Sequence, residues 1–225
     1  MITKLPRWVG WGGALLAMIG GFVNAVGFLG LAHEALSHLT GTTTQSALAL
    51  VLGDWSAFGH TLAVLLAYTG GAVLSGIIVQ QSTLQLGRRY GVALFVESLL
   101  LFAATPLLLH HLRWGDYLAT CACGLQNGMV TSYSGAVIRT THMSGIVTDL
   151  GILLGHGIRG LPVDRKRLQL GLMLFLSFFA GSAVGAILFS RFSYAALLFP
   201  ATLTGLIGIS YSVYRHQQRY RQRQA

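Results

Sequence analysis

Six long apolar segments run through the sequence, and their length limits the available folds more than any other feature. They cover residues 8–31, 58–80, 90–110, 115–137, 168–190 and 193–213. An apolar helix needs about 20 residues to cross the ~30 Å hydrocarbon core of a bilayer. Charged residues make up only 9% of the chain, whereas a soluble domain carries about 25%. We therefore expect an all-α, polytopic membrane protein, folded as a single membrane domain over residues 1–225.

Two shorter apolar segments, 40–53 and 144–157, begin with polar motifs that resemble each other. The stretch from His38 to Gly53 aligns with that from His142 to Gly157 without a gap. Besides the histidines and the final glycines, the aligned pairs include Thr40 with Ser144, Gly41 with Gly145 and Thr44 with Thr148. A helix of about 14 residues covers only ~21 Å, which is less than the hydrocarbon core. We therefore expect two short re-entrant or broken helices beside the six long transmembrane helices.

The similarity continues on both sides of the motifs. Residues 21–25 parallel residues 124–128, so that Asn24 corresponds to Asn127, and residues 68–73 parallel residues 179–184. This pattern predicts two homologous halves, about 8–111 and 112–214. Three crossings per half would invert the halves relative to each other, and four would leave them parallel, so the orientation stays open. The small-residue spacings at 71–75 and 181–185 are typical of helices whose backbones approach closely.

Positive charge predicts the topology. The net charge of +9 is concentrated in residues 159–167 and 215–225, and Lys and Arg are retained on the cytoplasmic side of bacterial membranes. If the short segments do not cross and the N-terminus is cytoplasmic, only Arg113 and Arg191 lie outside. We therefore expect both termini, including a basic tail over 215–225, in the cytoplasm. The tail accompanies no nucleic-acid recognition fold, so we expect no nucleic-acid partner.

The repeated motifs supply the candidate substrate-binding residues. Thr40 or Ser144 could cap the short helix that it begins, and the positive helix end could then face an anion or a carbonyl group. Histidine can hydrogen-bond a solute and titrates near neutral pH. The structural alternative is that these residues only satisfy a buried helix end. The full candidate set is Asn24, His38, Thr40, Gly41, Thr44, Asn127, His142, Ser144, Gly145 and Thr148.

Two acidic residues, Glu97 and Asp149, lie inside expected helices. A carboxylate at the centre of a bilayer costs about 2.5–3.5 kcal/mol on insertion scales, so such a residue usually faces a cavity or a partner. Either residue is a candidate to carry a coupling proton. Pairing with an asparagine or an arginine is the structural alternative.

Signatures of other functions are weak. Cys121 and Cys123 form an isolated Cys-x-Cys pair, and no nucleotide fingerprint or phosphate loop is present. We therefore expect no cofactor, no metal and no enzymatic activity. Two alternatives remain: an intramembrane enzyme, which would need His38, His142, Glu97 and Asp149 to meet in space, and a noncatalytic scaffold or partner subunit.

Several of these residues carry a resemblance to a known family. The stretch from Arg139 to Gly151, the stretch from Ala122 to Asn127, and Glu97 are similar to the YoaK-like family of bacterial multi-pass membrane proteins, which are largely of unknown function. The resemblance covers nearly the whole chain. Family members often carry Asp at the position of Asn24 and Asn at that of Thr42. The resemblance implies an integral protein of the bacterial inner membrane and supplies no substrate.

Taken together, these features predict secondary transport of a small solute by alternating access, with proton coupling as one option. The solute site would lie near the membrane midplane, where the Thr/Ser-Gly starts of the two short helices meet. The expected partners are a small-molecule solute and the lipid bilayer. The oligomeric state stays open, and a homo-oligomer is one of the alternatives.

Overall fold

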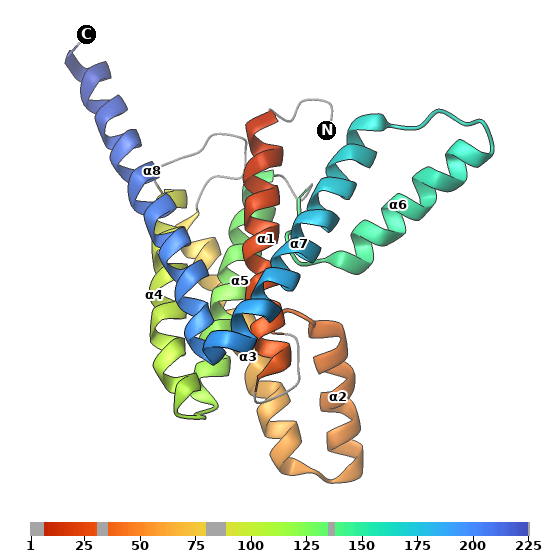
Figure 1. The fold of residues 1–225 in the computed structure, drawn as a ribbon, viewed down its shortest axis with the longest axis vertical. Coiled ribbons are helices and arrows are strands. Elements are labelled where there is room, and N and C mark those ends of the chain that lie inside the picture. The colour runs from red at the N-terminus through yellow and green to blue at the C-terminus, as the bar shows by residue number, and fades with distance from the viewer. Residues whose placement is uncertain (1–6, 31–35, 80–88, 135–137, 225) are drawn as a thin grey trace.

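A computed structural model describes residues 7–30, 36–79, 89–134 and 138–224, and the regular secondary structure in these ranges is helical (Figure 1). The expected all-α class is therefore confirmed. The elements are α1 (Arg7–Leu29), α2 (Leu39–Leu52), α3 (Trp55–Ile78), α4 (Arg89–Leu109), α5 (Trp114–Ser134), α6 (Met143–Ile158), α7 (Arg165–Phe192), the 3-10 turn η2 (Ser193–Leu197) and α8 (Leu198–Gln224).

Four helical stretches of the described chain are long and apolar enough to cross a membrane. They are Trp8–Leu29, Trp55–Ile78, Arg89–Leu109 and Arg165–Tyr214, and the last of these contains α7, η2 and α8. Helix α5 is not among them, because polar residues such as Thr120, Gln126 and Asn127 interrupt its apolar sequence. The chain is therefore a helical membrane protein, and a total of six spanning helices remains a prediction.

The long helices α1, α3, α4, α5, α7 and α8 alternate in direction along the long axis of the molecule (Figure 1). Helix α1 begins and α8 ends at the same end, which is uppermost in Figure 1. The short helices α2 and α6 begin near the middle, and α2 runs toward the lower end while α6 runs toward the upper end (Figure 1). Each forms a hairpin with the helix that follows it, α3 or α7.

An aspartate side chain caps the N-terminus of the second helix in each hairpin. Gly53 has a left-handed backbone with φ of +73° and ends α2, and the side chain of Asp54 then accepts a 2.9 Å hydrogen bond from the Ala57 N–H in the first turn of α3. Asp164 accepts from the N–H groups of Lys166 and Arg167 at the start of α7. Each cap satisfies donors that the helix itself leaves free.

Glycines allow two helix pairs, α3 with α5 and α1 with α7, to touch through their backbones. A Cβ atom added at Gly71 would collide with the carbonyl of Cys121, and one at Gly124 with the carbonyl of Tyr68. In the other pair, Gly181 lies against the carbonyl of Met18 and Gly21 against that of Phe178. The close approach expected from the small-residue spacings is therefore present in both pairs.

These contacts can be compared between the two helix pairs. The carbonyl that faces Gly124 belongs to Tyr68, and the one that faces Gly21 belongs to Phe178. In these contacts Tyr68 and Phe178 hold equivalent places, whereas the sequence alignment paired Tyr68 with Phe179. The two registers differ by one residue, because the alignment matches Gly70 to Gly181, while the contacts match Gly71 to Gly181.

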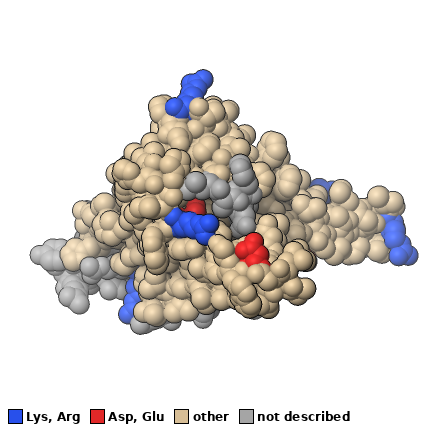
Figure 2. Space-filling model, turned by 90° about the horizontal axis from the view of Figure 1, so that it is seen from below, with Lys and Arg blue, Asp and Glu red and all other residues tan. Residues whose placement is uncertain are grey.

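The outer surface is poor in charge. Seen from below, the molecule shows a few separate patches of Lys, Arg, Asp and Glu on a largely uncharged surface (Figure 2). Large apolar side chains are exposed along most helices, including Val51 at 84% and Ile158 at 88%. A soluble protein rarely exposes so much apolar surface, and lipid chains would cover it in a bilayer.

Candidate functional site

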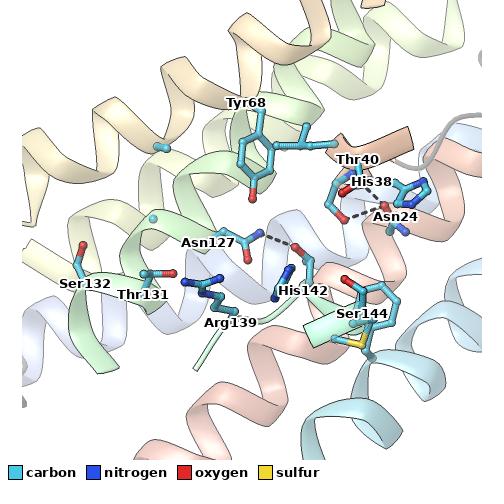
Figure 3. Close-up of a pocket in the computed structure, with 17 residues that line it drawn as sticks. Asn24, His38, Thr40, Tyr68, Asn127, Thr131, Ser132, Arg139, His142 and Ser144 are labelled. Carbon is cyan, nitrogen blue, oxygen red and sulfur yellow. Dashed lines mark hydrogen bonds between the residues drawn. The ribbon is translucent and has the colours of Figure 1, made fainter. Parts of the chain in front are cut away.

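A cavity of about 750 Å³, lined by many polar side chains, lies where the short helices begin. Its lining includes the starts of α2 and α6 and residues of α1, α3, α5 and α7. Six of the ten predicted site residues line it: Asn24, His38, Thr40, Asn127, His142 and Ser144. Both copies of the repeated motif therefore reach one space, as the close-up shows (Figure 3).

The N-cap residues of the short helices lie two residues before the predicted caps. The N-cap residues are His38 and His142, and their backbones agree closely, with φ of −89° and −86° and ψ of 59° and 64°. Thr40 and Ser144 therefore lie in the first helical turn, and the prediction that they cap these helices is wrong. Neither histidine side chain forms a capping hydrogen bond, so the first N–H groups are not satisfied by a cap.

The four predicted residues outside the cavity lining support its walls. A Cβ atom added at Gly41 would collide with the His38 ring, and one at Gly145 with the His142 ring. The two glycines therefore make room for the imidazoles over the first helical turn. Thr44 donates to the carbonyl of Thr40 at 3.0 Å, and Thr148 donates to that of Ser144 at 2.9 Å.

The two asparagines lie in different hydrogen-bond networks. In α1, Asn24 Oδ1 accepts from both the backbone N–H and the hydroxyl of Ser37, each at 3.0 Å. In α5, Asn127 Nδ2 donates to Thr141 Oγ1 at 2.8 Å and to the Cys123 carbonyl at 3.0 Å. Asn24 thus ties α1 to the start of α2, and Asn127 ties α5 to the segment that leads into α6.

Arg139 and Tyr68 are among the lining residues that were not predicted as site residues. Sequence reasoning counted Arg139 among the cytoplasmic charges, yet it lines the cavity together with Tyr68 of α3. Figure 3 shows both side chains beside Asn127. The available signal was the position of Arg139 directly before the second motif, three residues ahead of His142.

Glu97 is buried in α4, outside the cavity lining. Only 2% of the residue is exposed. Its Oε1 accepts a 3.0 Å hydrogen bond from Gln126 Nε2, whereas Oε2 is without a partner in the described residues. Gln126 Oε1 in turn accepts from Thr140 Oγ1 at 3.2 Å, and the same hydroxyl lies 3.2 Å from Asn127 Oδ1. A hydrogen-bonded chain therefore joins Glu97 to a residue of the cavity wall.

Asp149 lies apart from both the cavity and Glu97. Its Oδ1 forms a 2.9 Å ion pair with Arg167 at the start of α7, and both side chains are 47% exposed. Among the described residues, hydrogen bonds connect Glu97 to the cavity wall and none connects Asp149 to it.

The four residues that the enzyme alternative needs do not all line the cavity. Within the described part of the chain, no three His, Cys, Asp or Glu side chains are grouped so that they could hold a metal ion. His38 and His142 share the cavity, but Glu97 and Asp149 do not line it. The convergence that the enzyme alternative required is therefore not present.

Comparison with known proteins gives one family. The model of DUF1275, a family described as proteins of unknown function, matches residues 12–210. No curated protein and no solved structure matches the chain.

Proposed function

The chain belongs to the DUF1275 family, whose proteins have unknown function, and we propose that this member moves a small solute across a membrane by alternating access. The solute binds in the cavity between the starts of α2 and α6. The observation that carries this proposal is the convergence of both copies of the repeated motif on that one cavity. Packing alone would not require both copies to line a common cavity of about 750 Å³.

A pseudo-two-fold relation between two halves supports the proposal. The two halves are compared by exchanging α1 with α5, α2 with α6 and α3 with α7. This exchange turns the α1–α7 contact into the α5–α3 contact, and it turns the α2–α3 hairpin into the α6–α7 hairpin. The fourth pair, α4 with α8, maps onto itself. Since α2 and α6 run toward opposite ends (Figure 1), the halves would be inverted. Inverted repeats around a central site are typical of secondary transporters.

The basic residues indicate which end of the molecule faces the cytoplasm. The α6–α7 loop and the end of α8 lie at the end where α1 begins, and the α4–α5 turn with Arg113 lies at the other (Figure 1). The basic loop over 159–167 and the basic tail therefore share one face. By the positive-inside rule we assign this face to the cytoplasm. Together with the resemblance to bacterial inner-membrane proteins, this supports our proposal of an inner-membrane protein with both termini inside.

Glu97 is the group that we assign to proton coupling. An ionised carboxylate can only accept hydrogen bonds, whereas a protonated one also donates. Protonation of Glu97 would favour a rotation of the Gln126 amide by about half a turn, because the protonated carboxyl donates to the amide oxygen. The amide nitrogen would then face Thr140. Thr140 would then accept from Gln126 and donate to Asn127. The protonation state of Glu97 would thereby reach the cavity wall as a change of hydrogen-bond direction.

Cysteine labelling tests alternating access without knowledge of the solute. Ser144→Cys is introduced into a protein that carries Cys121→Ser and Cys123→Ser, and inverted and right-side-out vesicles are treated with a membrane-impermeant maleimide. We expect labelling from both sides, because the site opens to each in turn. Arg113→Cys and Arg159→Cys serve as controls that react from opposite single sides. Labelling of Ser144→Cys from one side only would contradict alternating access and favour a scaffold.

A further inference from the structure

We infer that the solute is a small anion carrying an oxyanion group, such as a carboxylate, a phosphate or a sulfate, and that Arg139 binds this group. The inference rests on the proposed function, since it names the chemical class of solute for the same cavity. It is carried by the charge and the free hydrogen-bond donors of the cavity wall.

Arg139 is the only charged side chain among the described residues that line the cavity. No described carboxylate forms an ion pair with it, and the one ion pair of the described chain joins Asp149 to Arg167. A guanidinium stays protonated and presents several N–H donors in a planar fork that matches an oxyanion. A cationic solute would meet this positive charge with no described carboxylate of the lining to balance it.

The amide of Asn24 adds a donor that no described residue uses. Its oxygen already accepts two hydrogen bonds from Ser37, which sets the orientation of the amide and turns its NH₂ group to the other side. No hydrogen bond from this NH₂ group occurs within the described residues. The amide of Asn127 is different, because both of its N–H bonds point to acceptors of the protein, Thr141 and the Cys123 carbonyl. Asn24 is therefore the asparagine with a donor left for a solute.

The starts of α2 and α6 add a positive potential. Neither helix has a side-chain cap. The N–H groups of Thr40 and Gly41 in α2, and of Ser144 and Gly145 in α6, have no backbone acceptor in the described chain. Each helix start carries roughly half a positive charge. Two such starts, one guanidinium and the Asn24 amide thus converge on a cavity whose described lining contains no carboxylate.

Thermal unfolding of the detergent-purified full chain tests this inference. The probes are sulfate, inorganic phosphate and succinate, with glucose as the neutral solute and putrescine as the cation, all at matched ionic strength. We expect saturable stabilisation by at least one of the anions. Arg139→Gln should weaken its binding about 10-fold or more, since a hydrogen bond to a charged group contributes that much. Arg139→Lys should retain part of the affinity, and Arg159→Gln, outside the cavity lining, should bind as the wild type does.

The outcomes separate the inference from the proposed function. Stabilisation by glucose or putrescine that survives Arg139→Gln, with none by the anions, would overturn the anion assignment and leave a solute site in place. Anion stabilisation that is unchanged in Arg139→Gln would also overturn it, because the ion would then bind elsewhere. If no probe stabilises the protein and Ser144→Cys reacts from one side only, both the inference and the transport proposal fail. If Arg139→Gln alters the elution profile or the melting temperature without ligand, its fold is disturbed, and Arg139→Lys is compared with the wild type instead.

Discussion

Replacing Gly71 with alanine should loosen the contact between α3 and α5. A Cβ atom at this position would collide with the carbonyl oxygen and carbon of Cys121 and with the backbone nitrogen of Leu125. Because all three atoms belong to the backbone, no side chain can rotate away, and the two helices must move apart. Gly70 is the matched control, since a Cβ atom there meets nothing within 4 Å.

The expected size of the effect follows from this comparison. Overpacking costs about 1–3 kcal/mol, and a collision between backbones belongs at the upper end of that range. Alanine also improves helix propensity over glycine by ~1 kcal/mol, but this gain is shared by Gly70→Ala and cancels between the variants. The free energy of unfolding should therefore differ by about 3 kcal/mol. For a chain of this length, each kcal/mol corresponds to about 2–4 °C, so Gly71→Ala should melt roughly 6–12 °C below Gly70→Ala.

Thermal unfolding of both variants in one detergent measures the difference. Gly181→Ala should behave like Gly71→Ala, because its Cβ atom would meet the Met18 carbonyl in the equivalent contact between α1 and α7. Equal melting temperatures for Gly70→Ala and Gly71→Ala would refute the reasoning, since the two helices would then not be in backbone contact.

Three further predictions concern the polar groups. Asp149→Asn should lower the free energy of unfolding by about 1 kcal/mol or less, because the ion pair of Asp149 with Arg167 is half exposed. A melting temperature that falls by more than ~5 °C would contradict this value. Loss of the proton dependence of transport would contradict the assignment of proton coupling to Glu97. Gln126→Leu should cost about 1–3 kcal/mol in a chemical or thermal unfolding assay, because it removes the hydrogen-bond donor to buried Glu97, and an unchanged stability would show that the bond contributes nothing. Gly145→Ala should displace the His142 ring and weaken ligand-induced stabilisation, with little loss of unliganded stability. Gly155→Ala is the control, because open space surrounds this position, and it should bind as the wild type does. Equal binding by both variants would show that His142 does not contribute to the site.

The boundaries of the short helices could be predicted because local chemistry sets them. The predicted segments 40–53 and 144–157 correspond to Leu39–Leu52 and Met143–Ile158, and Gly53 ends α2 in the left-handed conformation that favours glycine. The capping residue was placed wrongly, because an N-cap is defined by backbone angles. Thr40 and Ser144 belong to residue types that prefer the cap, whereas His38 and His142 occupy it.

The partners of the charged residues could not be predicted, because they depend on contacts between distant segments. Glu97 and Asp149 appeared equivalent in the sequence. In the structure, Glu97 pairs with Gln126, which is 29 residues away and on another helix, while Asp149 pairs with Arg167 across the α6–α7 hairpin. The position of Arg139 in the cavity wall depends in the same way on how the chain returns from α5 to the start of α6.

The opposite courses of α2 and α6 have an electrostatic consequence. Both helices begin at the cavity and run toward different ends of the molecule (Figure 1), so their macrodipoles are arranged head to head. Along the long axis of the molecule the two dipoles partly cancel at a distance and form a quadrupole with its positive lobe at the centre. The paired helices would therefore interact weakly with the transmembrane voltage as a unit, while the positive potential that they create stays confined to the space between their first turns.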